Sequence, residues 1–241
     1  MAGVVVFQDI SERVRGERLL ASQRDVMAMI ARGEPLADTL AEIVTAYERL
    51  SDRGGRASIL HTSADGRRLK HGAAPSMPAL YNEAVNGLEI GPSAGSCGTA
   101  AYRRKAVVVR DTQRDQLWAN FRELAAEHRL RSCWSTPVFA TDGALVGTMA
   151  IYHGEPAEPS VEEQEVVELL SRTAAVAIER DRDVRTRERQ LSELQTSLLP
   201  PQIPEIQGVE VSATFHPGDR TLDVGGDFYD IFPLSDRAWV W

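Results

Sequence analysis

Hydrophobic positions predict two amphipathic helices near the start of the chain. Residues 10–31 and residues 36–50 carry apolar side chains three or four positions apart, which is the spacing of one helical face. Gly33 and Pro35 lie between these segments and favour a break there. An apolar run at residues 4–8 indicates a short strand before the first helix. We therefore expect one strand and two helices in the first fifty residues.

The segment from residue 56 to residue 152 has the pattern of hairpins separated by helices. Asp65-Gly66 and Asp142-Gly143 are hairpin signals, and each lies between two apolar stretches of strand length. Asp115 is a suitable N-cap for an amphipathic helix between the hairpins. The five expected strands are residues 56–62, 67–71, 106–111, 133–140 and 144–152. This order favours an α+β fold in which helices pack on one mostly antiparallel sheet.

A single long helix is expected after the sheet. Ser160 and Glu163 match a capping box, because the serine hydroxyl and the glutamate carboxylate can each accept from an exposed backbone N–H. No glycine or proline follows until Pro200, so the helix can run to about Leu198 and measure roughly 55 Å. Its first half is apolar enough to pack on a sheet.

The second half of this helix allows two interpretations. Residues 179–190 are densely charged, which is typical of a solvated helix. Val184, Leu191 and Leu198 are seven positions apart, which is a short heptad pattern. We therefore assign residues 182–200 to a coiled-coil linker through which the protein would form a homodimer.

Composition and charge exclude several classes of protein. The net charge is −8, and no stripe of Lys and Arg with interleaved aromatics suits nucleic acid. Apolar runs are far too short to span a membrane, and the first residues lack the features of a signal peptide. Cys97 and Cys133 are two cysteines in 241 residues, which suits free thiols in a reducing compartment. We expect a cytoplasmic protein that binds neither nucleic acid nor membrane.

A glycine-rich acidic turn near the end of the chain is a candidate metal site. Asp227 and Asp230 follow Gly225-Gly226 in a segment that comes after the strand pattern of residues 208–215. Such a turn can present carboxylates to a hard metal ion. Because Mg²⁺ takes octahedral oxygen coordination, carboxylates from separate strands must converge on it. A further strand is expected to begin at Ala238, and few residues follow to supply those partners.

The last fifty residues resemble the metal-dependent PPM-type serine/threonine phosphatases of the bacterial stress-regulator and sporulation class. The resemblance rests on Leu194–Pro200, Pro204, Gly208–Val211, Phe215–Pro217, Val224–Asp230 and Phe232. It implies two bridging Mg²⁺ or Mn²⁺ ions, with Asp227 as a metal ligand, Gly226 allowing close approach, and Asp230 in a secondary role. A metal-bound water would attack a phosphoserine or phosphothreonine.

By the same resemblance, residues 201–241 are the first strands of an α/β-sandwich phosphatase domain. The later aspartates that complete the family's site have no counterpart before Trp241. We therefore expect this chain alone to be inactive as a phosphatase.

The middle of the chain resembles a bacterial subgroup of GAF domains, which are regulatory sensor modules. The residues that carry the resemblance are Gly95–Ala101, Val108–Asp111, Leu117-Trp118, Cys133–Val138, Gly143, Gly147-Thr148 and Ile151-Tyr152. It implies a GAF domain over residues 34–181. Phe7–Arg13 also resembles the last strand and exit helix of a PAS domain, so residues 1–9 would be a PAS tail and residues 10–33 a signalling helix.

Four residues of the GAF-like segment are candidates for a ligand or redox role. Cys97 lies in a glycine-rich loop at a helix start, where a thiolate is favoured, although a small buried residue is the simpler explanation. Trp118, Phe121 and Trp134 could line a pocket or pack in the core. The free methionine-R-sulfoxide reductases, which share the GAF fold, carry a similar stretch around Cys97. Cys133, which lies within an expected strand, departs from the reductase pattern.

Together these features predict a GAF sensor that controls a metal-dependent protein phosphatase. The expected partner is a phosphoprotein, and the class suggests a phosphorylated anti-sigma-factor antagonist. The alternatives are a stand-alone GAF sensor of a small molecule or of redox state, and a GAF-type reductase that uses Cys97. The sequence does not name the ligand of the GAF domain.

Overall fold

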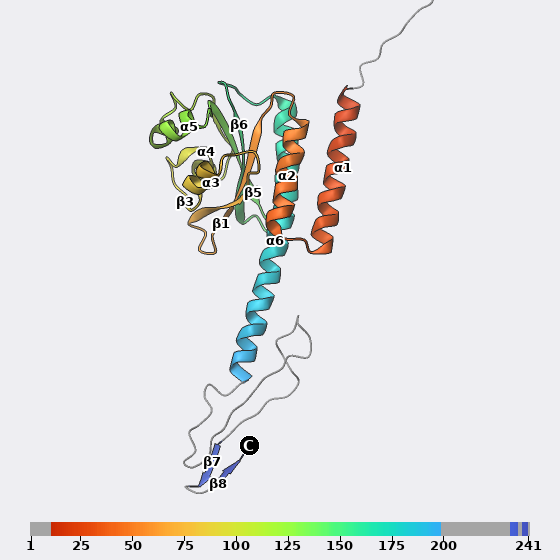
Figure 1. Cartoon of the computed structure of the whole chain (residues 1–241), viewed down its shortest axis with the longest axis vertical. Coiled ribbons are helices and arrows are strands. Elements are labelled where there is room, and N and C mark those ends of the chain that lie inside the picture. Colours follow the sequence, from red (N-terminus) through yellow and green to blue (C-terminus); the bar gives the residue numbers. More distant parts are fainter. Residues whose placement is uncertain (1–10, 199–231, 236–237, 241) are drawn as a thin grey trace, which may run out of the picture. The chain divides into compact units, whose positions relative to one another are not determined.

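A computed structural model describes residues 11–198, 232–235 and 238–240 of the chain, with side chains over residues 13–193 (Figure 1). The chain divides into two units, Met1–Asp181 and Arg182–Trp241, and each is described by itself. The strands expected at residues 4–8 and 208–215, and the acidic turn at Val224–Asp230, lie outside the described residues.

The first unit contains a six-stranded antiparallel sheet in the order β3-β2-β1-β6-β5-β4. Its strands are β1 Arg56–Thr62, β2 Arg68–Ala73, β3 Leu88–Glu89, β4 Val107–Val109, β5 Ser132–Phe139 and β6 Leu145–His153. The α+β fold with an antiparallel sheet is confirmed. The sequence predicted five strands and missed β3, because two residues are too short to show an alternating pattern.

Helices cover both faces of this sheet (Figure 1). They are α1 Ser11–Arg32, α2 Leu36–Leu50, α3 Ala79–Val85, α4 Gly95–Arg103, the 3₁₀ helix η1 Gln116–Phe121, α5 Arg122–Glu127 and α6 Val161–Leu198. α1, α2 and α6 contribute to one hydrophobic core, and α3, α4, η1 and α5 contribute to the other. Alternation along β5 divides the strand between them, with Trp134 in the first core and Cys133 in the second.

The predicted amphipathic helix after Asp115 is two shorter elements. The Asp115 carboxylate accepts a hydrogen bond from the backbone N–H of Leu117 at 2.8 Å, so the predicted N-cap is confirmed. The chain then forms η1 rather than an α-helix. Phe121 has a φ of −120° and a ψ of 5°, outside helical geometry, so α5 begins as a separate helix.

α6 begins at the capping box that the sequence predicts. The carboxylate of Glu163 accepts from the Ser160 backbone N–H at 2.8 Å, and the Ser160 hydroxyl accepts from the Glu163 N–H at 3.2 Å. The helix buries Leu170, Ala174 and Ile178 among its apolar side chains and continues to Leu198 as one element. The expected long helix is therefore confirmed.

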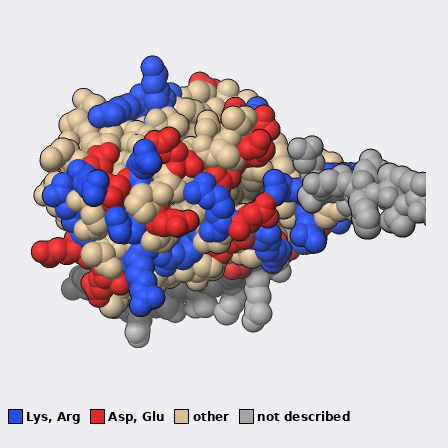
Figure 2. Space-filling view, turned by 90° about the horizontal axis from the view of Figure 1, so that it is seen from above, with Lys and Arg blue, Asp and Glu red and all other residues tan. Residues whose placement is uncertain are grey.

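In the second unit, β7 Phe232–Ser235 pairs antiparallel with β8 Ala238–Val240, where a strand was expected. Across the helices that the structure describes, none has the length and apolar character to cross a membrane. On the face seen in Figure 2, cationic and anionic side chains are interspersed, so this face presents no large area of a single charge.

Candidate functional site

A small cavity lies between the sheet and the elements α3, α4 and η1. Cys97 of α4, Trp118 and Phe121 of η1, Tyr81 of α3 and Tyr152 of β6 are among its lining residues. Its volume is about 20 Å³, which is room for about one water molecule. A larger ligand would need η1 or α4 to move away from the sheet.

Two glycines in the Gly-Ser-Cys-Gly run position α4 over the cavity. Gly95 has a φ of +59°, a conformation that side chains with a β-carbon rarely adopt. A β-carbon on Gly98 would lie 2.9 Å from the carbonyl oxygen of Glu89, so this glycine lets the helix approach β3 closely. Together they place Cys97 in the first turn of α4, facing the sheet.

Buried polar groups around the cavity form a connected set of hydrogen bonds. The Trp118 indole N–H donates to the Ser96 hydroxyl at 2.8 Å, and Ser96 donates to the carbonyl of Cys133 at 3.4 Å. The Cys97 thiol lies 3.2 Å from the Ser135 hydroxyl. All of these side chains are buried, so a ligand that enters here meets polar groups already held in place.

Tyr152 extends this set from the other side of the cavity. Its hydroxyl lies 3.1 Å from the hydroxyl of Ser58 and 3.9 Å from the sulfur of Cys97. The Tyr152 ring meets the Tyr81 ring edge to face, with 5.7 Å between centroids. Burial raises the pKa of Tyr152, so the phenol stays protonated and can donate a hydrogen bond at neutral pH.

The two thiols have opposite acidities. Hydrogen bonds from the Cys133 thiol and from the Ser135 hydroxyl lower the pKa of Cys97 to about 7, while burial opposes them. The start of α4 adds a partial positive charge beside Cys97, which favours a thiolate further. Burial, and then the neighbouring Cys97, raise the pKa of Cys133. Cys97 is therefore the more acidic thiol of the pair.

The candidates from the sequence separate into two places. Cys97, Trp118 and Phe121 line the same cavity. Trp134 lies on the opposite face of the sheet, where its indole N–H donates to the carbonyl of Ala157 at 3.3 Å. The three aromatic residues therefore do not line one pocket. The physical reason is alternation, since Cys133 and Ser135 point to the side of the sheet that carries Cys97, and the residue between them points to the other side.

Sequence reasoning missed several polar residues in and beside the cavity. Tyr81, Ser96 and Tyr152 line it. Ser58 bonds to Tyr152, and Ser135 bonds to Cys97. Alternation along β5 and β6 could have placed Ser135 and Tyr152 on the same side of the sheet as Cys133. The residues to which they bond come from distant elements, which alternation does not reveal. The proposed metal residues Gly226, Asp227 and Asp230 lie outside the described residues. Within the part of the chain that the structure describes, no cluster of three His, Cys, Asp or Glu side chains could hold a metal.

We expect Tyr152→Phe to lower the free energy of unfolding by about 1–2 kcal/mol, because it leaves the buried Ser58 hydroxyl without its tyrosine partner. Urea denaturation measures the change. Tyr102→Phe is the matched control, since Tyr102 is exposed on α4 and should change stability by less than about 0.5 kcal/mol. Equal effects of the two substitutions would contradict the buried network.

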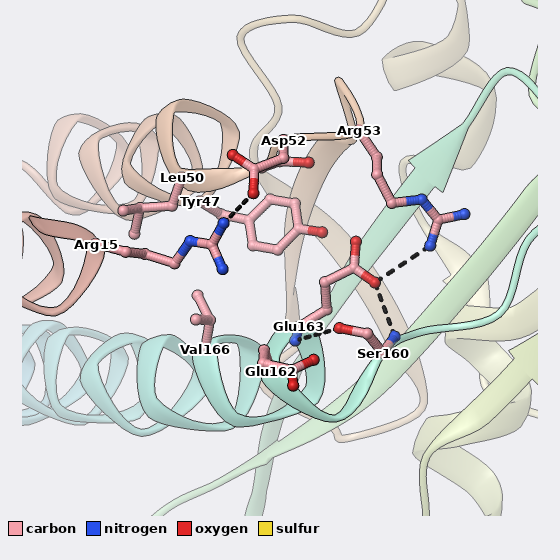
Figure 3. A pocket seen from close by; sticks show the side chains of 10 residues that line it. Arg15, Tyr47, Leu50, Asp52, Arg53, Ser160, Glu162, Glu163 and Val166 are labelled. Carbon is pink, nitrogen blue, oxygen red and sulfur yellow. Dashed lines mark hydrogen bonds and ion pairs between the residues drawn. The ribbon is translucent and has the colours of Figure 1, made fainter. Parts of the chain in front are cut away.

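A second cavity, of about 180 Å³, lies where α1, the end of α2 and the start of α6 meet (Figure 3). Arg15 of α1 pairs with Asp52 in the loop after α2, and Arg53 in that loop pairs with Glu163 of α6 at 3.4 Å. The hydroxyl of Tyr47 points toward Arg53 and Glu163 (Figure 3) and makes no hydrogen bond to the residues described. The loop of residues 51–53 thus connects the helix that enters the sheet unit with the helix that leaves it.

Comparisons with known proteins agree with this architecture. A family model described as a GAF domain matches residues 33–179. The methyl sulfide methyltransferase-associated sensor of Methanosarcina acetivorans is 33% identical over 174 residues, which are 72% of this chain. The chain spans 17% of the length of that relative.

Two solved structures have the same fold. The GAF domain of a phosphoenolpyruvate-protein phosphotransferase from Coxiella burnetii has a TM-score of 0.57 at 16% identity, over 70% of this chain and 98% of that one. The free methionine-R-sulfoxide reductase from Neisseria meningitidis has a TM-score of 0.55 at 16% identity, over 76% and 98% of the two chains. Because the family model covers more than half of its residues, this chain belongs to the GAF domain family.

Proposed function

We propose that this chain is the sensory and regulatory part of a metal-dependent protein serine/threonine phosphatase. The observation that carries the proposal is α6, one uninterrupted helix from Val161 to Leu198. Its first part packs in the GAF core. The sequence after it contains motifs around Gly226-Asp227 that resemble those of the PPM-type phosphatases and occur in the same order. A signal at the GAF domain would reach those motifs through this helix.

The cavity beside Cys97 is the proposed sensory end. Its polar groups are already bonded to one another, so a small ligand or a chemical change at the thiol would have to rearrange them. Such a change can alter the regulated state only if it favours one of two conformations of the domain. α4 and η1 are the elements that would move, since both line the cavity.

The loop of residues 51–53 is the proposed coupling element. It is paired with α1 through Arg15 and with α6 through Glu163. Glu163 also caps the first turn of α6, so a shift of the loop would act directly at the start of the output helix. Exposed ion pairs contribute little to stability, which makes this junction suited to rearrangement rather than to holding the fold.

At the proposed output end, Asp227 would be a ligand of Mg²⁺ or Mn²⁺, with Gly226 allowing close approach and Asp230 in a secondary role. Two such ions supply an activated water and stabilise charge on a transferred phosphoryl group. Aspartates beyond Trp241 would complete the site in a longer protein. The substrate would be a phosphoserine or phosphothreonine protein, of which a phosphorylated anti-sigma-factor antagonist is our first candidate.

We also propose that the active protein is a cytoplasmic homodimer. Val184 and Leu191 of α6 are 41% and 48% exposed and stand seven residues apart on a charged helix, which is the pattern of a coiled-coil seam. Pairing two α6 helices would bury these side chains and hold two output segments together.

The assay for this function is Mn²⁺-dependent release of phosphate from a phosphoserine peptide. We expect activity from the protein that continues past Trp241 through the remaining phosphatase motifs, and loss of that activity with EDTA. The 241-residue chain should be inactive in the same assay. An extended protein that binds Mn²⁺ but releases no phosphate would contradict the proposal.

A GAF-type reductase is the second candidate, favoured by one observation. Cys97 combines a lowered pKa with a place at the cavity wall, as a catalytic thiol requires. NADPH oxidation coupled through thioredoxin, with free methionine sulfoxide as substrate, separates the two functions. Turnover by the reduced 241-residue chain would favour the reductase, and its absence would remove it.

A further inference from the structure

Two free thiols face one buried space from different elements of the GAF domain. Cys97 comes from the first turn of α4 and Cys133 from β5. Their sulfur atoms lie 3.2 Å and 3.9 Å from the same atom, the hydroxyl oxygen of Ser135. The Cys133 thiol also hydrogen-bonds directly to Cys97, so the two sulfurs are neighbours although the cysteines are distant in sequence.

The surroundings give the two thiols different chemical roles. Cys97 lines the small cavity and retains 7% exposure. Cys133 is fully buried behind it. Cys97 also has the lower pKa of the two, and the thiolate is the reactive form of cysteine. A small oxidant would react with Cys97 first, and Cys133 lies where it can then form a disulfide with the oxidised Cys97.

We propose that Cys97 and Cys133 are a hydroperoxide-oxidised pair that forms a reversible disulfide inside the GAF domain. The Cys97 thiolate attacks one peroxide oxygen, the O–O bond breaks, and hydroxide leaves, which gives a sulfenic acid on Cys97. The sulfur of Cys133 then attacks that of Cys97, the S–O bond breaks, and the departing hydroxide takes the Cys133 proton as water. In total, two thiols are oxidised and one hydrogen peroxide is reduced to two waters.

The disulfide would change the geometry of the cavity. A disulfide holds its sulfurs about 2.05 Å apart, which is closer than hydrogen-bonded neighbours. It would draw α4 toward β5 and remove the thiol partner of Ser135. Ser96, which follows Gly95 in the same helix turn and accepts from Trp118, would move with it. The oxidised domain would thus present a different cavity to a ligand.

The test oxidises the reduced 241-residue chain with one equivalent of hydrogen peroxide at pH 7.5. Differential alkylation in denaturant, before and after dithiothreitol, followed by mass spectrometry, reports the state of each thiol. We expect a loss of two hydrogen atoms, one peptide pair linked through Cys97 and Cys133, and full recovery of both thiols on reduction. Thiols that stay alkylatable after peroxide, or a bond that links two chains, would overturn the proposal.

Variants separate the two steps of the reaction. Cys133→Ser should leave Cys97 as a sulfenic acid that dimedone traps, and Cys97→Ser should leave Cys133 reduced. Because either variant can disturb the buried network, the wild-type chain unfolded in urea is a second control. Its disulfide should form at least about tenfold more slowly, since neither the cavity nor the thiolate environment remains. Equal rates folded and unfolded would show that the fold does not assemble this pair.

The same chain also distinguishes the pair from a methionine sulfoxide reductase. With free methionine sulfoxide in place of peroxide, we expect both thiols to remain reduced. Oxidation by the sulfoxide at the rate seen with peroxide would assign the pair to the reductase reaction and overturn its assignment as a peroxide-modified site.

Discussion

Gly147→Ala should lower the free energy of unfolding by about 3 kcal/mol, the largest stability effect that we expect from a single added methyl group. Gly147 lies on β6, between β1 and β5 in the sheet. A β-carbon there would overlap the carbonyl oxygen of Leu60 and lie 3.2 Å from the Cα of His61. Both neighbours are backbone atoms of a paired strand, so no rotamer change can relieve the contact. Urea denaturation measures the loss.

Gly143→Ala is the matched control for this substitution. Gly143 is in the hairpin turn before β6 and has a φ of +83°, but no atom lies within 4 Å of a β-carbon built there. Gly143→Ala should lower the free energy of unfolding by about 1 kcal/mol, because only backbone strain is added. If the two variants unfold at the same urea concentration, the close approach of β6 to β1 is not what requires glycine at position 147.

Asp227→Asn should abolish Mn²⁺-dependent phosphatase activity in the protein that extends past Trp241, with a fall of at least about 100-fold. Asparagine keeps the size of the side chain but removes the charge, and hard divalent ions depend on carboxylate oxygens. Substituting groups that only orient the ligands of a metal already lowers metal affinity or activity by about 10- to 100-fold. Initial rates on a phosphoserine peptide across a Mn²⁺ titration measure both the loss and any weakening of metal binding.

Asp223→Asn provides the comparison for this variant. Asp223 is four residues earlier in the same segment and carries the same charge, but the resemblance assigns it no metal role. Its variant should keep activity within about threefold of the wild type, and both variants should melt at the wild-type temperature. Equal losses in the two variants would show that the segment needs its overall charge rather than a ligand at Asp227.

Local signals predicted most of the sheet. Asp65-Gly66 and Asp142-Gly143 mark the β1–β2 and β5–β6 turns, because a tight hairpin needs those residue types. The pairing of β1 with β6 joins segments more than eighty residues apart, and no local pattern encodes it. The helix after Asp115 divides into η1 and α5 at Phe121, whose backbone leaves helical geometry, and the spacing of apolar residues does not encode that break.

The part of the candidate site that lies within one short sequence motif was predictable. The glycine-rich run around Cys97 indicated a helix start, and the structure places Cys97 in the first turn of α4. The sequence could not show that Cys133 and Ser135 lie next to Cys97, because β5 meets α4 through tertiary packing. Trp134 is a different case, because alternation along β5 already places it on the face opposite Cys133, where its indole N–H donates to Ala157.

We propose that the GAF domain controls a phosphatase through the register of α6. The most direct measurement is Mn²⁺-dependent phosphatase activity of the extended protein with residues inserted between Arg185 and Thr186. One inserted alanine rotates everything after it by about 100°, whereas seven inserted residues restore the heptad register. We predict that the single insertion changes activity by at least about fivefold and that the seven-residue insertion leaves it near the wild-type rate. Equal activity in all three proteins, or activity in none, would contradict the account.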